Sequence, residues 1–293
     1  MLNQSYQPFT GGPFIFNPGM NIFTTLGLDE LFNNYKLLGG FKFGFNGSME
    51  YLFSIENLMH RLDKQIIFYR QSNKQVFDNL GFQSFVMKTI TNDLKLILRY
   101  PFNQTSSIRG TLFGKYDRLI TLSSGYSTLV VPDEYNIYTG AKLEYIFDNT
   151  RTLSTNLLDG IRFKTFGEVY QQVEGDYDYT IVLGSDFRFY KKIFRNLIYA
   201  GRIAGSSSLG SGKVLYYLGG VDNWMTLFPE VLFNRTVNIN YDENFMFQAV
   251  ATNMRGFSQN IRNGSNFVVS NHEIRLPIIQ FFANYPINSD LWY

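Results

Sequence analysis

Hydrophobic and polar residues alternate over long stretches of this chain, with the two-residue period that is typical of β-strands. Within 36–46, for example, Phe41, Phe43 and Phe45 share one face and Lys42 lies on the other. The alternation recurs within 93–100, 108–117, 141–148, 161–170, 181–189 and 197–205. It predicts strands at 18–28, 36–46, 48–57, 64–72, 84–101, 106–120, 136–148, 158–171, 178–191, 196–207 and 265–277, with 11–18 as a further candidate and no helix of substantial length.

Such alternation fits either a soluble β-sandwich or a transmembrane β-barrel. Three features favour the barrel. The apolar faces are aromatic, with Tyr near the strand ends; the segments have about the 9–12 residues that a tilted membrane strand needs; and a tight turn at 103–106 contrasts with a long loop at 123–135. The barrel predicts outward side chains at Phe41, Phe43, Leu94, Leu96, Leu143 and Phe187, and inward ones at Lys42, Lys95, Glu144 and Arg188.

Composition narrows the class of protein. The chain has 293 residues, 17% of them aromatic and 17% charged, with no Cys and a net charge of +2. No apolar run reaches the roughly 18 residues of a transmembrane helix, disulfides and thiolate sites are excluded, and no global basic signal points to nucleic acid. Residues 1–12 lack the features of a signal peptide, so an outer-membrane protein of this sequence is expected to be part of a longer precursor.

Four motifs follow one another in and after the segment 208–264, which the pattern leaves as one very long connection. They are Gly219-Gly220, Met254-Arg255-Gly256-Phe257, Gly264-Ser265-Asn266 and Glu273-Ile274-Arg275-Leu276-Pro277. The order resembles the Omp85 (bacterial surface antigen) superfamily, whose members carry a GG element, an RGF or RGY loop tip, a GGN-like strand start and an E-x-R-x-P strand. Residues 28–34 and 98–102 are similar to that family's periplasmic turn and "YP" strand end, so the resemblance covers essentially the whole chain.

The resemblance implies an all-β fold, one antiparallel outer-membrane β-barrel domain over 1–293. The family's barrel has 16 strands, and 18–277 would match about the second to the twelfth. The chain is therefore expected to be truncated at both ends and to form an open sheet of about 11–12 strands, with 18–28 and 265–277 as its edges. The segment 208–264 would be a long extracellular loop that folds into the lumen.

The resemblance also assigns site residues. Arg255, at the loop tip with Gly256 and Phe257, would pair with Glu273 on the barrel wall and lock the loop inside; the alternative is a solvated loop arginine. The remaining motif residues are Gly219, Gly220, Gly264, Asn266, Arg275 and Pro277. No catalytic residue, metal or cofactor is expected.

The implied function is insertion or translocation of proteins at the bacterial outer membrane, without enzymatic chemistry. The expected partners are outer-membrane lipid, unfolded outer-membrane or secreted proteins and periplasmic partner domains, but no nucleic acid. Two alternatives remain, a passive outer-membrane pore or transporter, and a membrane anchor for a periplasmic TolB-like WD40 propeller. The latter arrangement occurs in large Bacteroidota proteins, which this Asn-, Tyr-, Phe- and Lys-rich sequence resembles.

Enzyme and pore chemistry find little support in the residues. The histidines are His60, in an expected turn, and His272, on the face opposite Glu273, and neither lies in a catalytic motif. A Ser–His pair of the kind that barrel phospholipases carry on the outer wall is not identified. The stretch 205–213 and the residue after it do not match a phosphate loop. Ser207 stands where that motif has its first Gly, and Val214 stands where it has Ser or Thr. Most of the charged residues expected to face the lumen are basic, namely Lys42, Lys95, Arg99, Arg162, Lys164, Arg188 and Arg202 beside Glu168. This composition fits either an anion-selective pore or a polar wall in contact with water.

Overall fold

A computed structural model describes residues 1–2, 4–12, 21–77, 85–123, 126–154, 156–194, 197–220, 233–254 and 256–276. These residues form an all-β structure with one short helix, α1 (Tyr126–Leu129). No helix in the described ranges has both the length and the apolar character to cross a membrane. The predicted strands are all present, with ends that differ by a few residues; of the further candidate, 11–18, only residues 11 and 12 are described.

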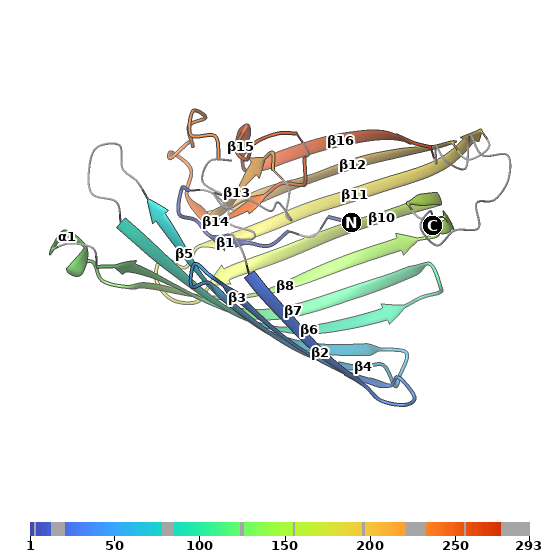
Figure 1. Cartoon of the computed structure of the whole chain (residues 1–293), viewed down its shortest axis with the longest axis horizontal. Coiled ribbons are helices and arrows are strands. Elements are labelled where there is room, and N and C mark those ends of the chain that lie inside the picture. Colours follow the sequence, from blue (N-terminus) through green and yellow to red (C-terminus); the bar gives the residue numbers. More distant parts are fainter. Residues whose placement is uncertain are drawn as a thin grey trace.

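One large antiparallel sheet contains 12 strands. Their order is β16 (Asn266–Arg275), β12 (Leu197–Gly210), β11 (Tyr179–Phe194), β10 (Leu157–Gln172), β8 (Glu134–Asp148), β7 (Ser106–Leu122), β6 (Phe85–Pro101), β5 (Asp63–Phe77), β4 (Met49–Asn57), β3 (Tyr35–Gly44) and β2 (Asn21–Asp29), with β9 (Arg151–Ser154) paired to β10. Figure 1 shows that the sheet is strongly curved. Its edges are β2 and β16, as predicted, and no pairing joins them in the described residues, so the sheet is open rather than a closed barrel.

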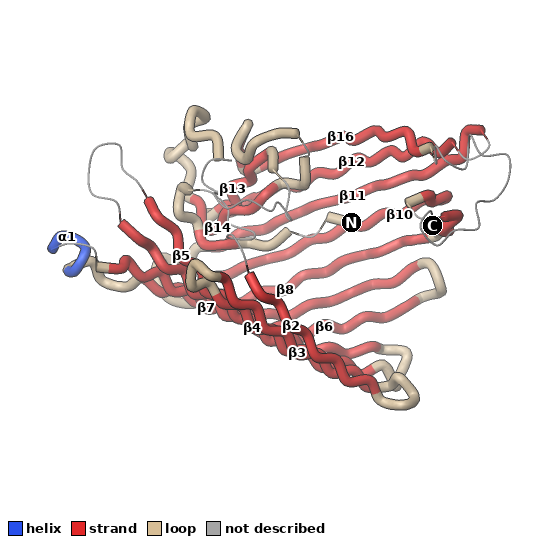
Figure 2. Tube along the Cα trace, viewed as in Figure 1, coloured by secondary structure: helices blue, strands red, loops and turns tan. Residues whose placement is uncertain are grey.

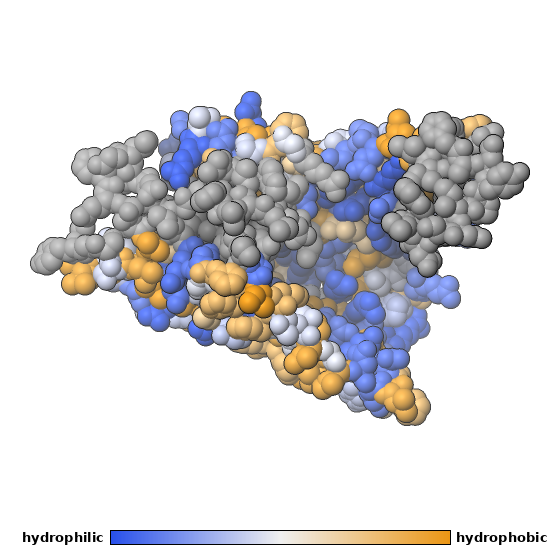
Figure 3. All heavy atoms as spheres, in the orientation of Figure 1, coloured by the Kyte–Doolittle hydropathy of each residue, from blue (hydrophilic) through white to orange (hydrophobic). Residues whose placement is uncertain are grey.

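The two faces of this sheet differ as the alternation predicts. On the convex, outer face Leu94 and Leu143 are 56% and 58% exposed. Phe41, Leu96 and Phe187 are also exposed, whereas Phe43 is half-buried. On the concave, inner face Glu144 is buried, and Lys42, Lys95 and Arg188 are partly buried. Figure 3 shows hydrophobic residues along the outside of β2–β4 and hydrophilic residues toward the concave side.

The segment 208–264 is not the structureless connection that the sequence predicts. It contains β13 (Lys213–Leu218), β14 (Phe245–Val250) and β15 (Arg262–Gly264), which form a second sheet with β1 (Gln7–Pro8) in the order β1-β14-β13-β15. β13 and β14 are parallel and buried on both faces. Strands buried on both faces read as continuous apolar runs, and a search for alternation therefore misses them.

The small sheet lies on the inner face of the large one (Figures 1 and 2). Val214, Tyr216 and Phe247 of the small sheet form one apolar core with residues of the large sheet, namely Tyr138, Phe166, Val182, Phe267 and Val269. Leu215, Tyr217 and Val250 pack on the other side of the small sheet against Phe9, Phe233 and Ile239. The second layer thus covers the polar, inner face and leaves the apolar, outer face uncovered.

Candidate functional site on the inner face of the sheet

The candidate site is the junction between the inner face of the large sheet and the structure that covers it. We call this covering structure the inner plug and define it as the described residues of 1–12 and 211–264. Its apolar side chains meet the few apolar residues of the inner face, and its polar groups meet charges. The two are therefore joined by core contacts and by hydrogen bonds, several of them to charged side chains.

The first charged group of the junction is centred on Asp186 of β11, which is fully buried. Arg188 and Arg202 each place Nη2 within 2.9 and 3.0 Å of Asp186 Oδ2, and each also donates through Nε to Oδ1. Arg202 Nη1 then donates to Thr252 Oγ1 of the plug at 2.8 Å. Bidentate guanidinium–carboxylate pairs are strong and fix geometry, so this group sets the position at which the plug meets β12.

A second group surrounds Glu168 of β10. The hydroxyl of Tyr6 donates to Glu168 Oε1, and Lys142 Nζ lies 3.2 Å from Glu168 Oε2. Burial, and then the neighbouring Glu168 carboxylate, raise the pKa of Tyr6 well above its usual value. Tyr6 therefore keeps its proton and remains the hydrogen-bond donor that ties the N-terminal part of the plug to the wall.

Lys115 of β7 provides the third connection. Its Nζ donates to the carbonyl oxygen of Tyr6 at 2.8 Å and lies 3.2 Å from Asp117 Oδ2. The ammonium group also lies 4.6 Å from the centre of the Phe247 ring, within the range of a cation–π interaction. Lys115 and Asp117 are both buried. One inner-face lysine thus holds both the N-terminal segment and β14.

The residues assigned to the loop lock are only partly described. Arg255 and Pro277 lie outside the described residues, so the expected Arg255–Glu273 contact stays a prediction. Glu273 does face inward, because its cross-strand partner is the buried Ala200. Its carboxylate accepts hydrogen bonds from Arg275, with Nη2 at 2.7 Å.

The other motif residues lie in the plug and in the connection from the plug to β16. Gly219 and Gly220 have φ of +97° and +83°, and Gly220 forms a β-bridge with Met254, next to the loop tip. Gly256 has φ +82°, and Phe257 is 49% exposed. Gly264 ends β15, and Asn266 begins β16, where it accepts a hydrogen bond from Ser207 Oγ at 2.5 Å. The Gly219-Gly220 element and Gly256 therefore lie together at one turn, although some 35 residues separate them in the sequence.

Substitution of two of these glycines is expected to lower the free energy of unfolding by different amounts. We expect Gly219→Ala to destabilise the chain by at least about 2 kcal/mol, because its φ is strained for an L-residue and an added Cβ would overlap the carbonyl oxygen of Ser258. Gly256→Ala should cost only about 1 kcal/mol, because nothing lies within 4 Å of the added Cβ. Urea unfolding followed by far-UV circular dichroism measures both; equal losses would show that the Ser258 contact is unimportant.

The structure also reveals a group on the outer face that the sequence analysis does not identify. His272 of β16 contacts Ser270 of the same strand through Nε2, at 2.9 Å, and Tyr199 of β12 through Nδ1, at 2.6 Å. Residues i and i+2 of a strand share a face, so the Ser–His half of this group is visible in the predicted strand 265–277. The tyrosine is not visible, because it depends on the register of β12 against β16.

No group of three or more His, Cys, Asp or Glu residues suited to a metal ion occurs within the described ranges. Comparison of the sequence with protein-family models and with curated proteins found no match. The assignment of a function therefore rests on the motifs of the sequence and on the two faces of the sheet.

Proposed function

We propose that this chain is part of an outer-membrane β-barrel of the Omp85 type, and that it takes part in the insertion or translocation of proteins at that membrane. The observation that carries the proposal is the inverted arrangement of the large sheet. Charged side chains lie on the inner face under a folded plug, and large apolar side chains lie uncovered on the outer face. Lipid is the environment in which that arrangement is stable.

The outer face is too apolar and too continuous for a surface in water. Leu96, Leu112, Ala141, Val169 and Ile181 form one row across five neighbouring strands. Monomeric soluble proteins rarely leave apolar patches of more than a few hundred Å² uncovered. The second sheet, which would bury such a face in a sandwich, lies on the opposite side.

The inner plug favours a gated role over a permanently open pore. It is held to the wall of the sheet by a shared apolar core and by hydrogen bonds to Lys115, Glu168 and Arg202. Met254, Gly256 and Phe257 of the RGF-type motif belong to this plug, whereas Arg255 lies outside the described residues. In the resembling family this element accompanies protein insertion, which is why insertion ranks above a passive pore.

In the resembling family the physical means is the weakly paired seam between the first and last barrel strands, which lie outside the second to twelfth strands that 18–277 would match. β2 is exposed from Ile22 to Asp29, and in the described residues neither it nor β16 has a second strand neighbour. An unpaired edge offers backbone donors and acceptors to an incoming strand, which is β-augmentation. An unfolded outer-membrane protein is a substrate that needs such pairing before it can leave water.

The membrane part of the proposal is tested by fluorescent labels on single cysteines, since the chain has none of its own. In lipid vesicles, brominated acyl chains should quench a label at Leu94→Cys, and aqueous iodide should not. The adjacent inner-face position, Lys95→Cys, should show the reverse. Iodide quenching at both positions would contradict the membrane assignment.

The insertion part has its own test, in the same vesicles. Wild-type protein should accelerate the folding of a small outer-membrane barrel into the bilayer, measured by its gel mobility without heating. Lys95→Gln, a change at a more exposed inner-face side chain, serves as the matched variant of normal membrane orientation. Steady single-channel conductance without acceleration would favour the pore, and neither effect would favour the anchor.

A further inference from the structure

The group formed by Ser270, His272 and Tyr199 has the geometry of an activated nucleophile. Ser270 Oγ lies 2.9 Å from His272 Nε2, and Tyr199 Oη lies 2.6 Å from His272 Nδ1. A hydroxyl within reach of an imidazole, with the imidazole oriented by a third group, is the arrangement that makes serine reactive. All three side chains lie on the outer face, and Ser270 and His272 are exposed.

Neighbouring aromatic rings hold the two larger members in place. Tyr199 and His272 are stacked, with ring centres 5.9 Å apart and planes 14° apart, and Phe189 packs on Tyr199 at 5.5 Å. When His272 carries its proton on Nδ1 and donates it to Tyr199 Oη, Nε2 is free to accept the proton of Ser270. The contact with Tyr199 Oη is compatible with this tautomer, in which His272 acts as a base.

The backbone beside Ser270 offers donors for a developing oxyanion. The N–H of Ser208 donates to the carbonyl oxygen of Ser265 at 3.0 Å, one pair beyond the β12–β16 register. Bonded and non-bonded pairs alternate in an antiparallel ladder, so Ser270 and His272 belong to non-bonded pairs. Their N–H groups point away from β12, toward the side of β16 where the described residues place no other strand.

A groove on the outer face leads to this group. Thr165, Ser185 and Gly205 form one row across β10, β11 and β12, between rows that carry larger side chains such as Leu183 and Phe187. The depression has a volume of about 830 Å³, within the roughly 300–1,000 Å³ of small-molecule sites. Val268 lines its end, two residues before Ser270 on the same face, a distance of roughly 7 Å along a strand.

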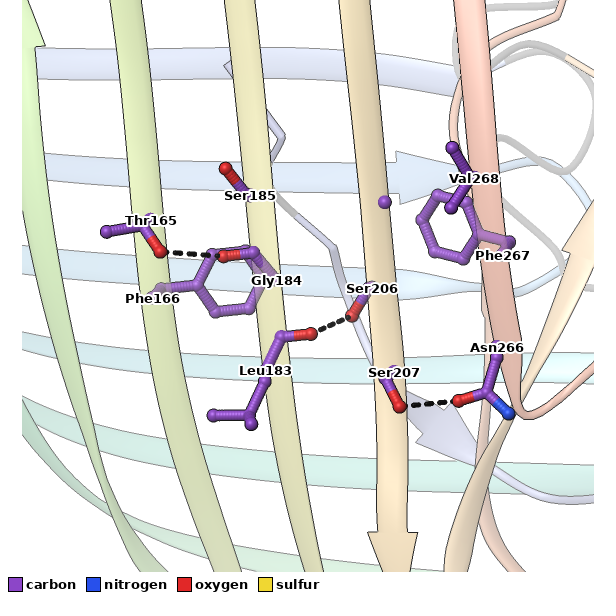
Figure 4. A pocket seen from close by; sticks show the side chains of 11 residues that line it. Thr165, Phe166, Leu183, Gly184, Ser185, Ser206, Ser207, Asn266, Phe267 and Val268 are labelled. Atoms are coloured by element: carbon purple, nitrogen blue, oxygen red, sulfur yellow. Dashed lines mark hydrogen bonds between the residues drawn. The ribbon is translucent and has the colours of Figure 1, made fainter.

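The groove presents mainly carbon to a ligand. The Thr165 hydroxyl donates to the backbone carbonyl of Gly184, and Ser207 donates to Asn266 (Figure 4). Leu183 and Val268 provide aliphatic walls. An extended hydrocarbon chain suits such a surface, and its polar end would reach the row of Ser270.

We propose that Ser270, His272 and Tyr199 form a hydrolytic site for carboxylic esters of long acyl chains, and that the acyl chain lies in the groove. Ser270 Oγ attacks the ester carbonyl while His272 Nε2 takes the hydroxyl proton, and the N–H groups of the β16 edge receive the oxyanion. The ester C–O bond then breaks, and the alcohol leaves with the proton from His272. A water molecule then attacks the acyl ester on Ser270 in the same way, which releases the fatty acid and restores Ser270. This activity is additional to protein insertion, and it requires that no further strand pairs with the edge of β16.

The test uses the full chain in detergent micelles, with 4-nitrophenyl palmitate and 4-nitrophenyl butyrate as substrates and a fluorophosphonate as a covalent probe. We expect the probe to modify Ser270, and Ser270→Ala and His272→Ala each to lower kcat about 100-fold or more. Tyr199→Phe should lower kcat and leave KM unchanged, because Tyr199 positions the base without touching the substrate.

Three further variants make the result specific. Ser185→Trp fills the groove and should raise KM for the palmitate ester but not for the butyrate ester. Ser123→Ala and His60→Ala, exposed residues outside the site, should keep wild-type rates. Failure of the probe to modify Ser270, or an unchanged rate in Ser270→Ala with circular dichroism of the wild type, would overturn the proposal.

Discussion

Replacing Asp186 with asparagine is expected to destabilise the folded chain by about 3 kcal/mol and to release the inner plug from β12. The carboxylate is fully buried and is shared by Arg188 and Arg202, whose side chains are only 23% and 17% exposed. The substitution removes one negative charge and leaves two guanidinium groups facing each other without compensation. Their remaining contact with water keeps the loss at the lower end of the range for a broken buried ion pair.

Hydrogen exchange separates this effect from a general loss of fold. In Asp186→Asn, the amides of β13 and β14 should exchange faster, and those of β6 and β7 should keep their protection. Asp133→Asn is the matched control, because Asp133 also accepts two hydrogen bonds from one arginine, Arg118, but its side chain is 35% exposed. That variant should change the free energy of unfolding by less than about 0.5 kcal/mol. Equal losses in both variants would show that burial of Asp186 is unimportant.

Phe247→Ala should have an effect of similar size through a different cause. Phe247 of β14 is fully buried, and its ring packs against Tyr138, Tyr170 and Tyr6 with centre distances of 4.8, 5.1 and 6.0 Å. Truncation leaves a cavity where the N-terminal segment, the small sheet and the large sheet meet. Such changes cost about 3–5 kcal/mol, and urea unfolding measures the loss.

The control for this variant is a phenylalanine of the same plug. Phe257→Ala removes a side chain that is 49% exposed, and it should cost less than about 1 kcal/mol. Phe247→Ala should also free residues 4–8, which limited proteolysis or exchange at the Tyr6 amide detects. Retention of their protection would mean that the hydrogen bonds of this segment to Lys115, Glu168 and β14 hold it without the Phe247 ring.

The large sheet could be predicted from the sequence because each of its strands carries its own signal. Strands such as β7 and β10 have one apolar face and one polar face, so the two-residue period marks them without any knowledge of their neighbours. From β2 to β12 the order of neighbours follows from sequence order, since consecutive long strands pair with each other, whereas β16 pairs with β12 across the inserted plug. The open edges are expected from the resemblance, because about 11–12 predicted strands fall short of the 16 in the family's barrel.

The inner plug could not be predicted in the same way. β13 and β14 are buried on both faces and carry no period, and β1 contains only Gln7 and Pro8. Their partners lie far away in the sequence, as in the bond from Gln4 to Ala251. The lumen charges Arg188, Arg202 and Glu168 were identified as inner-face residues, but their roles depend on Asp186, Tyr6 and Thr252, which only the folded arrangement brings to them.

The pairing of β1 with β14 has a consequence for the order in which the chain folds. Hairpins such as β3–β4 close short loops and can form as soon as both strands exist, whereas the bond between Thr10 and Gln248 spans 238 residues. Closing a loop of that length carries a large entropy cost before any contact stabilises it, and high contact order slows folding. The N-terminal residues must therefore wait, unpaired, until nearly the whole chain has been synthesised. Docking of the N-terminal segment on β14 is therefore expected after the hairpins of the large sheet have formed.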